Sequence, residues 1–143
     1  MNRYEDLMQR QHAEFHAFPM QFAFSREQFA EGMAALGLEP TDMDKVCKTS
    51  GGGFYRKEDS PRLKEMMHRF DRELQSAIAG DRTGDGFIYE MFLSELREHE
   101  YGYTRDLGET LDALDYTPDD IQVDPRLRHG LEKARKEILK GRC

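Results

Sequence analysis

The sequence predicts a mainly α-helical protein, a compact multi-helix single domain that carries a small β-hairpin. Two observations predict the helices: apolar residues recur at three- and four-residue spacing, and cap or stop residues stand at the segment ends. A third observation predicts the hairpin, because two strand-like segments flank a run of glycines. The length of 143 residues is that of one ordinary domain, so we expect residues 1–143 to form a single helical domain.

The first helix is predicted from Arg3 to Ala17. Asn2 can cap it with the help of Glu5 three residues later, and Pro19 ends it. The next segment, residues 18–24, alternates aromatic and other side chains. This alternation predicts an extended segment directly after the first helix.

A second helix is predicted from Ser25 to Gly37. Ser25 and Gln28 have the spacing of a capping box, and Gly37 is a typical residue for the end of a helix. A shorter helix is expected after Thr41.

The hairpin is predicted where residues 46–49 and 54–57 flank the glycine run Gly51–Gly53. The run resembles a phosphate-binding loop only in composition, because such a loop needs a helix directly after it. Phe54 and Tyr55 follow instead, and these residues are typical of a strand. We expect these two aromatic side chains to be exposed, where they can form a homodimer contact.

Three longer helices are predicted from Ser60 onward. The first begins at Ser60-Pro61, a cap followed by proline at the first helical position, and ends at Gly80. The second places Ile88 and Leu96 on one face. The last begins at Asp124-Pro125 and presents an apolar stripe.

An internal repeat relates two segments of the chain. Residues 29–43 align without gaps on residues 107–121, and the alignment pairs Pro40 with Pro118. Each copy predicts a helix, a turn containing proline and a short second helix. A helix that reads DNA carries Arg, Lys, Asn or Gln, so we expect packing corners instead of DNA readers. The second helices carry the acidic residues Asp42, Asp44, Asp119 and Asp120.

The loop of residues 81–92 resembles a degenerate calcium-binding EF-hand loop. Asp81, Thr83 and Asp85 place side-chain oxygens at loop positions one, three and five, and a glycine stands at position six. Position twelve requires a bidentate glutamate but holds Phe92. A weak calcium or magnesium site is therefore one interpretation. A polar connector in which the aspartates cap backbone groups is the favoured one.

Two further groupings contain histidine. His12 and His16 share a helix face, but two histidines leave a zinc site short of ligands, so a solvated pair is favoured over a metal site. His99 stands between Glu98 and Glu100, and Tyr101 follows directly. An enzyme built on these groups is a third hypothesis, but no nucleophile accompanies them, so no catalytic residue is assigned.

The charge pattern indicates which classes of molecule the protein can bind. The net charge of -7 argues against nucleic acid, which requires a basic surface. Residues 106–124 contain seven acidic and no basic residues, whereas residues 126–142 contain seven Lys and Arg residues. These two segments can pair internally, dock partners of opposite sign or form two solvated faces.

The location and the cofactor content follow from absences in the sequence. It contains no apolar run of membrane-spanning length and no signal segment. Cys47 and Cys143 lie too far apart in sequence for a metal-ligand pair and form no disulfide framework. A cytoplasmic protein without a cofactor and without a membrane partner is therefore expected.

Several short blocks of the sequence together resemble a known group of proteins. The blocks are Phe22-Ala23-Phe24-Ser25, Gly52-Gly53-Phe54, Thr83-Gly84-Asp85-Gly86-Phe87-Ile88, His99-Glu100-Tyr101-Gly102-Tyr103-Thr104 and Asp124-Pro125-Arg126-Leu127. They are similar to blocks in small uncharacterised bacterial proteins of gut bacteria and their plasmids, phages and conjugative elements. The resemblance implies a cytoplasmic accessory protein of a mobile element, and it implies no known activity, cofactor or catalytic residue.

The leading functional hypothesis is a non-enzymatic protein-interaction or regulatory module. Its partner surface is predicted at Asp112, Asp115, Asp119 and Asp120, whose charges would attract a basic protein and speed its encounter. The alternative hypothesis is weak binding of calcium or magnesium by the loop of residues 81–92.

Overall fold

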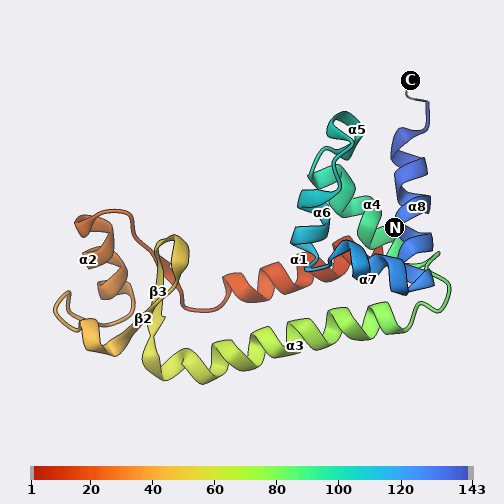
Figure 1. Cartoon of the computed structure of the whole chain (residues 1–143). Helices are drawn as coiled ribbons and strands as arrows, with labels where there is room; N and C mark the ends of the chain where they lie inside the picture. The colour runs from red at the N-terminus through yellow and green to blue at the C-terminus, as the bar shows by residue number, and fades with distance from the viewer. Residues whose placement is uncertain (1, 142–143) are drawn as a thin grey trace. The chain divides into compact units, whose positions relative to one another are not determined.

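The computed structural model describes residues 2–141 (Figure 1). The structure is 69% helical and contains a small antiparallel sheet, which confirms the predicted mainly α-helical fold with a small β element. The chain divides into two compact units. Unit 1 comprises Met1–Arg10 and Glu73–Cys143, and unit 2 comprises Gln11–Arg72. The prediction of a single domain stays a prediction.

Two long helices contribute to both units. They are α1 (Arg3–His16) and α3 (Ser60–Ala79). The remaining elements of unit 2 are β1 (Gln21–Phe22), α2 (Arg26–Ala35), β2 (Val46–Lys48), β3 (Gly53–Arg56) and three short 3₁₀ segments, Met43–Lys45, Ser50–Gly52 and Lys57–Asp59. The remaining elements of unit 1 are α4 (Phe87–Glu98), α5 (Tyr101–Thr104), α6 (Gly108–Ala113), α7 (Pro118–Val123) and α8 (Pro125–Leu139).

Local capping contacts set the starts of the first helices. The Asn2 side chain accepts a hydrogen bond from the Glu5 amide at 2.9 Å, as predicted for α1. Ser25 accepts from the Gln28 amide at 3.1 Å at the start of α2. Ser60 differs from the prediction, because its backbone is already helical and follows directly on a 3₁₀ segment. It therefore begins α3 without capping it.

The sheet of unit 2 has the strand order β1–β3–β2, with both pairs antiparallel. This confirms the predicted hairpin and adds β1, which comes from the predicted extended segment. The central position of β3 buries Phe54, which is 2% exposed, and Tyr55, which is 9% exposed. The expectation that these two side chains are exposed is therefore wrong. A strand with neighbours on both edges packs its side chains into the cores on the two faces of the sheet.

Each unit has its own hydrophobic core. Unit 2 has two clusters, one around Met33 and Phe54 and one around Phe18 and Tyr55. Unit 1 has one larger cluster, and the centre of it is the apolar face of α4, which packs along α8. Its fully buried members are Ile88, Met91, Phe92, Leu96 and Ala134, each 0% exposed.

The sequence repeat is also a structural repeat, with one copy in each unit. We call residues 29–43 copy 1 and residues 107–121 copy 2. In both copies a helix ends in a residue with a left-handed backbone, Gly37 with φ 77° in copy 1 and Asp115 with φ 59° in copy 2. The aligned positions therefore have the same unusual conformation.

The hydrogen bonds that end the two helices also correspond. In copy 1 the Leu38 amide donates to the Met33 carbonyl at 2.8 Å, and in copy 2 the Tyr116 amide donates to the Leu111 carbonyl at 2.9 Å. This long bond across a left-handed residue is the Schellman arrangement, which satisfies carbonyl groups at a helix end. The packing corners expected from the sequence are two examples of one turn.

An aspartate closes the second half of each turn. The Asp42 carboxylate accepts from the Glu39 amide at 2.9 Å in copy 1. The Asp120 carboxylate accepts from the Thr117 amide at 2.8 Å in copy 2. These two aspartates are aligned in the repeat, and the same hydrogen bond explains why both copies have an aspartate at this position.

Candidate functional site

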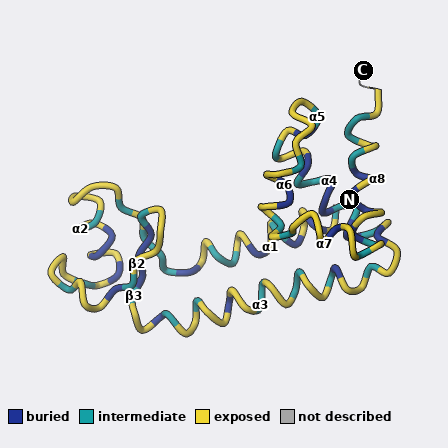
Figure 2. Tube along the Cα trace, viewed as in Figure 1, coloured by how far each residue is buried: buried dark blue, intermediate teal, exposed yellow. Residues whose placement is uncertain are grey.

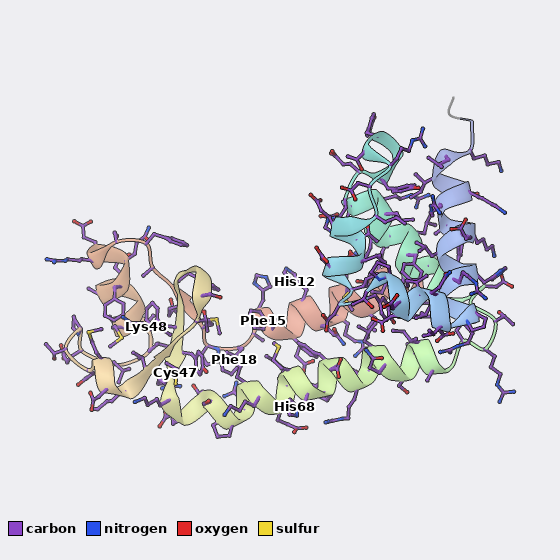
Figure 3. The ribbon with its side chains drawn as sticks, viewed as in Figure 1. His12, Phe15, Phe18, Cys47, Lys48 and His68 are labelled. Atoms are coloured by element: carbon purple, nitrogen blue, oxygen red, sulfur yellow. The ribbon has the colours of Figure 1, made fainter. Side chains whose placement is uncertain are left out.

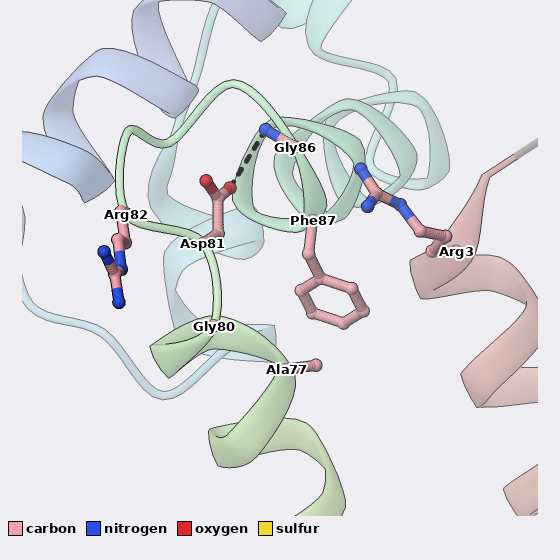
Figure 4. A pocket seen from close by; sticks show the side chains of 7 residues that line it. All are labelled: Arg3, Ala77, Gly80, Asp81, Arg82, Gly86 and Phe87. Carbon is pink, nitrogen blue, oxygen red and sulfur yellow. Dashed lines mark hydrogen bonds between the residues drawn. The ribbon is translucent and has the colours of Figure 1, made fainter.

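The loop between α3 and α4 in unit 1 is organised around the Asp81 carboxylate. One carboxylate oxygen accepts from the amides of Thr83 at 3.3 Å and Gly84 at 2.9 Å. The other accepts from the amides of Gly86 and Ile88, each at 3.0 Å. Figure 4 shows the carboxylate turned toward the Gly86 amide. Asp81 therefore caps the loop and the first turn of α4, as the connector interpretation predicts.

These contacts also explain the ionisation of Asp81. Partial burial raises its pKa, but the four backbone donors lower it more, and the net pKa lies below the ordinary value. Asp81 is therefore a carboxylate at neutral pH. Its negative charge is shared among the four amide groups that hold the loop.

The other two predicted loop ligands have partners as well. The Thr83 hydroxyl accepts from the Asp85 amide at 3.2 Å. The exposed Asp85 carboxylate lies 2.7 Å from His129 Nε2 and 3.3 Å from Lys133 Nζ, both on α8. Hydrogen bonds from His129 and then Lys133 lower the pKa of Asp85. A histidine and a lysine of α8 thus face a loop oxygen that an EF-hand uses for calcium.

A third side chain of α8 binds the backbone of the same loop. Arg126 donates from Nη1 to the carbonyls of Ile78 at 3.0 Å and Asp81 at 2.9 Å. The close contact also requires Gly84, whose φ is 89° and whose added Cβ would lie 2.2 Å from the Arg126 carbonyl oxygen. The sequence did not predict this role of α8, although the adjacent acidic and basic segments indicated internal pairing as one option.

The twelfth position of the loop belongs to the core. Phe92 is 0% exposed and packs in the cluster of unit 1. Within residues 2–141, no three or more His, Cys, Asp or Glu side chains gather in a group that can hold a metal ion. Cation binding by Asp81, Thr83 and Asp85 stays a prediction.

A pocket of about 490 Å³ lies beside the loop. Arg3 is at its edge and is held by Glu90, with 3.0 Å between Nε and the carboxylate. This hydrogen bond raises the pKa of Arg3 and lowers that of Glu90. The pocket is therefore bordered by an ion pair. Its lining residues, drawn in Figure 4, are Arg3, Ala77, Gly80, Asp81, Arg82, Gly86 and Phe87.

The four predicted partner-surface aspartates all lie in copy 2 and are exposed, as Figure 2 shows for the region of α6 and α7. Asp120 has the capping role described above. Within the described part of the chain, the carboxylates of Asp112, Asp115 and Asp119 have no hydrogen bond or ion pair. Three of the four carboxylates are thus available to another molecule.

Copy 1 shows that these three carboxylates are not needed to make the turn. The aligned residues of copy 1 are Ala34, Gly37 and Thr41. The shared turn forms with these side chains just as it does with three aspartates. The acidic charge of copy 2 is therefore additional to the needs of the fold.

The side chains near His99 do not converge on one point. His99 lies 3.4 Å from Glu109 through Nδ1 and 3.9 Å from Glu95 through Nε2. Tyr101 is buried, and its hydroxyl accepts from Arg135 Nε on α8 at 2.8 Å. The histidine and the tyrosine therefore have separate partners on different elements.

In unit 2, His12 and His16 lie on an exposed face of α1, with 2.9 Å between their Nε2 atoms. Cys47 is a half-buried free thiol in β2. Cys143 lies outside the described residues. Among residues 2–141, no helix is both long and apolar enough to cross a membrane.

Comparison with known proteins gives a family without an assigned function. Neither the curated proteins nor the solved structures contain a match to this chain. Residues 3–137 match the model of a family described as a family of unknown function, DUF7659. This match covers nearly the whole chain and agrees with the predicted resemblance to an uncharacterised family. The chain belongs to the DUF7659 family.

Proposed function

We propose that this protein is a non-enzymatic interaction or regulatory module that binds a basic protein through the acidic face of copy 2. The acidic face consists of Asp112, Asp115, Asp119 and Asp120. A cytoplasmic location and a role in a mobile genetic element are parts of the proposal that rest on the sequence alone.

The comparison of the two copies carries the proposal. Three carboxylates of copy 2 replace Ala34, Gly37 and Thr41 of copy 1, and the turn is the same. Like charges close together on a surface oppose one another, so they weaken the folded state by a small amount. A surface that carries this charge without a structural use is suited to attract an oppositely charged partner.

The test is a charge-neutralising variant of the acidic face. Asp112→Asn, Asp115→Asn and Asp119→Asn are combined, while Asp120 is kept because it caps the turn. The matched control combines Glu27→Gln, Glu31→Gln and Asp44→Asn, which removes the same charge from exposed positions in unit 2. Quantitative capture from the native host identifies basic proteins bound by the wild type and by the control but lost by the acidic-face variant.

The captured protein is then purified and its association rate is measured at several salt concentrations. We expect the rate to fall about tenfold or more in the acidic-face variant at low salt, and the difference to shrink as salt screens the charges. Equal association rates for the wild type and both variants would overturn the proposal. Thermal unfolding of each variant checks that the comparison is made between folded proteins.

The second candidate function is weak binding of calcium or magnesium by the loop of residues 81–92. The observation in its favour is the lowered pKa of Asp81 and Asp85, which keeps both carboxylates charged. A bound cation would have to compete with the backbone amides at Asp81 and with His129 and Lys133 at Asp85. Titration of each cation, followed through the Gly86 amide by NMR, tests this function. A saturable shift that Asp81→Ala abolishes would support it, and no shift up to millimolar cation would exclude it.

A further inference from the structure

We propose that His12 and His16 form a two-imidazole chelate for a divalent transition metal of the copper or nickel type. The residues are four apart on α1, and both side chains are exposed. Figure 3 shows the His12 ring turned away from α3. A metal ion can therefore reach this pair from solvent. The site belongs to unit 2 and is independent of the acidic face.

The separation of the two rings fits two neighbouring positions on one metal ion. The Nε2 atoms are 2.9 Å apart and the ring centroids are 4.3 Å apart. Two metal–nitrogen bonds of about 2.05 Å at a right angle put the nitrogens about 2.9 Å apart and the centroids about 4.5 Å apart. A tetrahedral angle gives about 3.3 Å and about 5.2 Å instead. The observed values match the right angle.

The ring geometry also differs from that of a straight hydrogen bond between imidazoles. A straight N–H···N bond of the same length puts the centroids about 5 Å apart. The observed 4.3 Å therefore excludes a straight bond between the rings, and it lies close to the value for two rings on one metal ion. Right-angled coordination by nitrogen is typical of Cu²⁺ and Ni²⁺, and Cu²⁺ has the highest affinity in the divalent series.

The protein supplies two ligands to this site. Glu14, which lies between the histidines in sequence, is held by Arg69 of α3, with 3.0 Å between Nη1 and the carboxylate. Within the described residues, no third His, Cys, Asp or Glu joins the pair in a metal-binding group. Water then fills the other positions, which suits a tetragonal ion better than a structural zinc ion with four protein ligands.

The test uses Cu²⁺ alone, added below one equivalent to the chain of residues 1–143. Cu²⁺ is paramagnetic, so NMR signals broaden around the place where it binds. We expect broadening centred on residues 12–16 and an affinity at least tenfold lower in His16→Ala, because the second ligand otherwise binds intramolecularly. His68→Ala, which removes a lone exposed histidine of α3, is the matched control and is expected to bind like the wild type.

A second variant separates chelation from histidine content. His16→Ala combined with Ala17→His keeps the number of histidines but places the second one in the turn after α1, five residues from His12, where it no longer shares a helix face with His12. We expect this variant to bind as weakly as His16→Ala. Wild-type affinity in the five-apart variant, or broadening centred away from residues 12–16, would overturn the proposal. The helical content of each variant is checked by circular dichroism.

Discussion

Copies 1 and 2 have the same turn but different residues at its most demanding position. Copy 1 uses Gly37 for the left-handed residue, and copy 2 uses Asp115. A side chain other than glycine has a steric cost in this conformation, although aspartate tolerates it better than most. The hydrogen bonds and the buried anchor therefore decide the turn. The exposed position beside them is left to vary, and in copy 2 it carries charge.

The two copies differ again after the turn. Thr117 of copy 2 accepts from the Asp120 amide at 3.2 Å, and the reciprocal bond completes a capping box. Glu39 stands at the aligned place in copy 1 and has no hydroxyl for this contact. Copy 2 continues into the α-helix α7, whereas copy 1 makes only a 3₁₀ turn at Met43–Lys45. In copy 1 the Asp42 amide donates instead to the Glu39 carbonyl at 2.9 Å, a bond that closes a tight turn.

The largest effect is expected from the buried anchors of the turn. Met33 is 0% exposed in copy 1, and Leu111 is 8% exposed in copy 2. Met33→Ala and Leu111→Ala are each expected to lower the free energy of unfolding by about 2–5 kcal/mol, because each leaves a cavity. Denaturant unfolding measures both losses. A loss below about 1 kcal/mol in either variant would show that its copy is not anchored by the core.

The next largest effect on stability is expected at Asp81. Its carboxylate accepts hydrogen bonds from four backbone amides, whereas the carboxylates of Asp42 and Asp120 each accept from one. Asp81→Asn is expected to lower the free energy of unfolding by about 2 kcal/mol at pH 7. The substitution removes a charged acceptor, and the side-chain NH₂ group of the asparagine then faces backbone N–H donors. The folded pKa of Asp81 is lowered, so its contribution is present above the unfolded pKa of about 3.9. The contribution is lost as the pH falls through the folded pKa.

Unfolding measured between pH 6 and pH 2 checks the sign of this Asp81 prediction. The free energy of unfolding of Asp81→Asn should depend less on pH than that of the wild type, and the two curves should approach each other in acid. Curves that stay parallel would contradict the assigned role of the carboxylate.

The aspartate caps of the two copies should contribute less to stability than Asp81 does. Asp42→Ala and Asp120→Ala are each expected to cost about 1 kcal/mol, the usual value for a lost cap. Asp119→Ala is the matched control, since it removes the neighbouring exposed acid and should change stability by less than about 0.5 kcal/mol. An equal loss at Asp119 would mean that charge, and not capping, explains the effect.

Substitutions at the left-handed position should change the stability in opposite directions in the two copies. Gly37→Ala is expected to cost about 1 kcal/mol, and this cost is conformational, since no atom outside residues 36–38 lies within 4 Å of the added Cβ. Asp115→Gly is expected to stabilise by a few tenths of a kcal/mol, because it relieves the same strain and removes a repelled charge. Thermal unfolding of both variants measures the pair, and changes of the same sign would contradict the comparison.

The smallest effect is expected from giving copy 1 the cap residue of copy 2. Glu39→Thr should stabilise by about 0.5 kcal/mol, because its hydroxyl offers the Asp42 amide the capping acceptor of copy 2 in place of the carbonyl of residue 39. The reverse loss, Thr117→Ala, should cost up to about 1 kcal/mol. Amide hydrogen exchange at residues 42–45 reports whether the second half of copy 1 becomes more protected. Unchanged exchange in Glu39→Thr would show that α7 depends on more than its cap.

The local elements of this protein could be predicted because neighbouring residues decide them. The cap of α1 at Asn2, the cap of α2 at Ser25 and the end of α3 at Gly80 each depend on contacts within a few residues. The hairpin and the loop connector around Asp81 are equally local. The repeat was visible for the same reason, since each turn is built from one continuous segment.

Burial and pairing between distant segments needed the tertiary structure. Phe54 and Tyr55 become buried because β3 has a strand on each side, and one of these strands comes from residues far earlier in the chain. The division into two units is equally a matter of contacts between segments far apart in sequence.

Patterns within short stretches of sequence were enough to predict the helices, the hairpin, the repeated turn and the excess of acid in copy 2. The folded structure was needed to show that α8 brings His129 and Lys133 to Asp85, and that three acids of copy 2 have no partner within the described chain. The physical reason is the range of the interactions. Caps and periodic apolar stripes act over one or two helical turns, whereas the partner of a surface charge depends on which elements the folded core brings together.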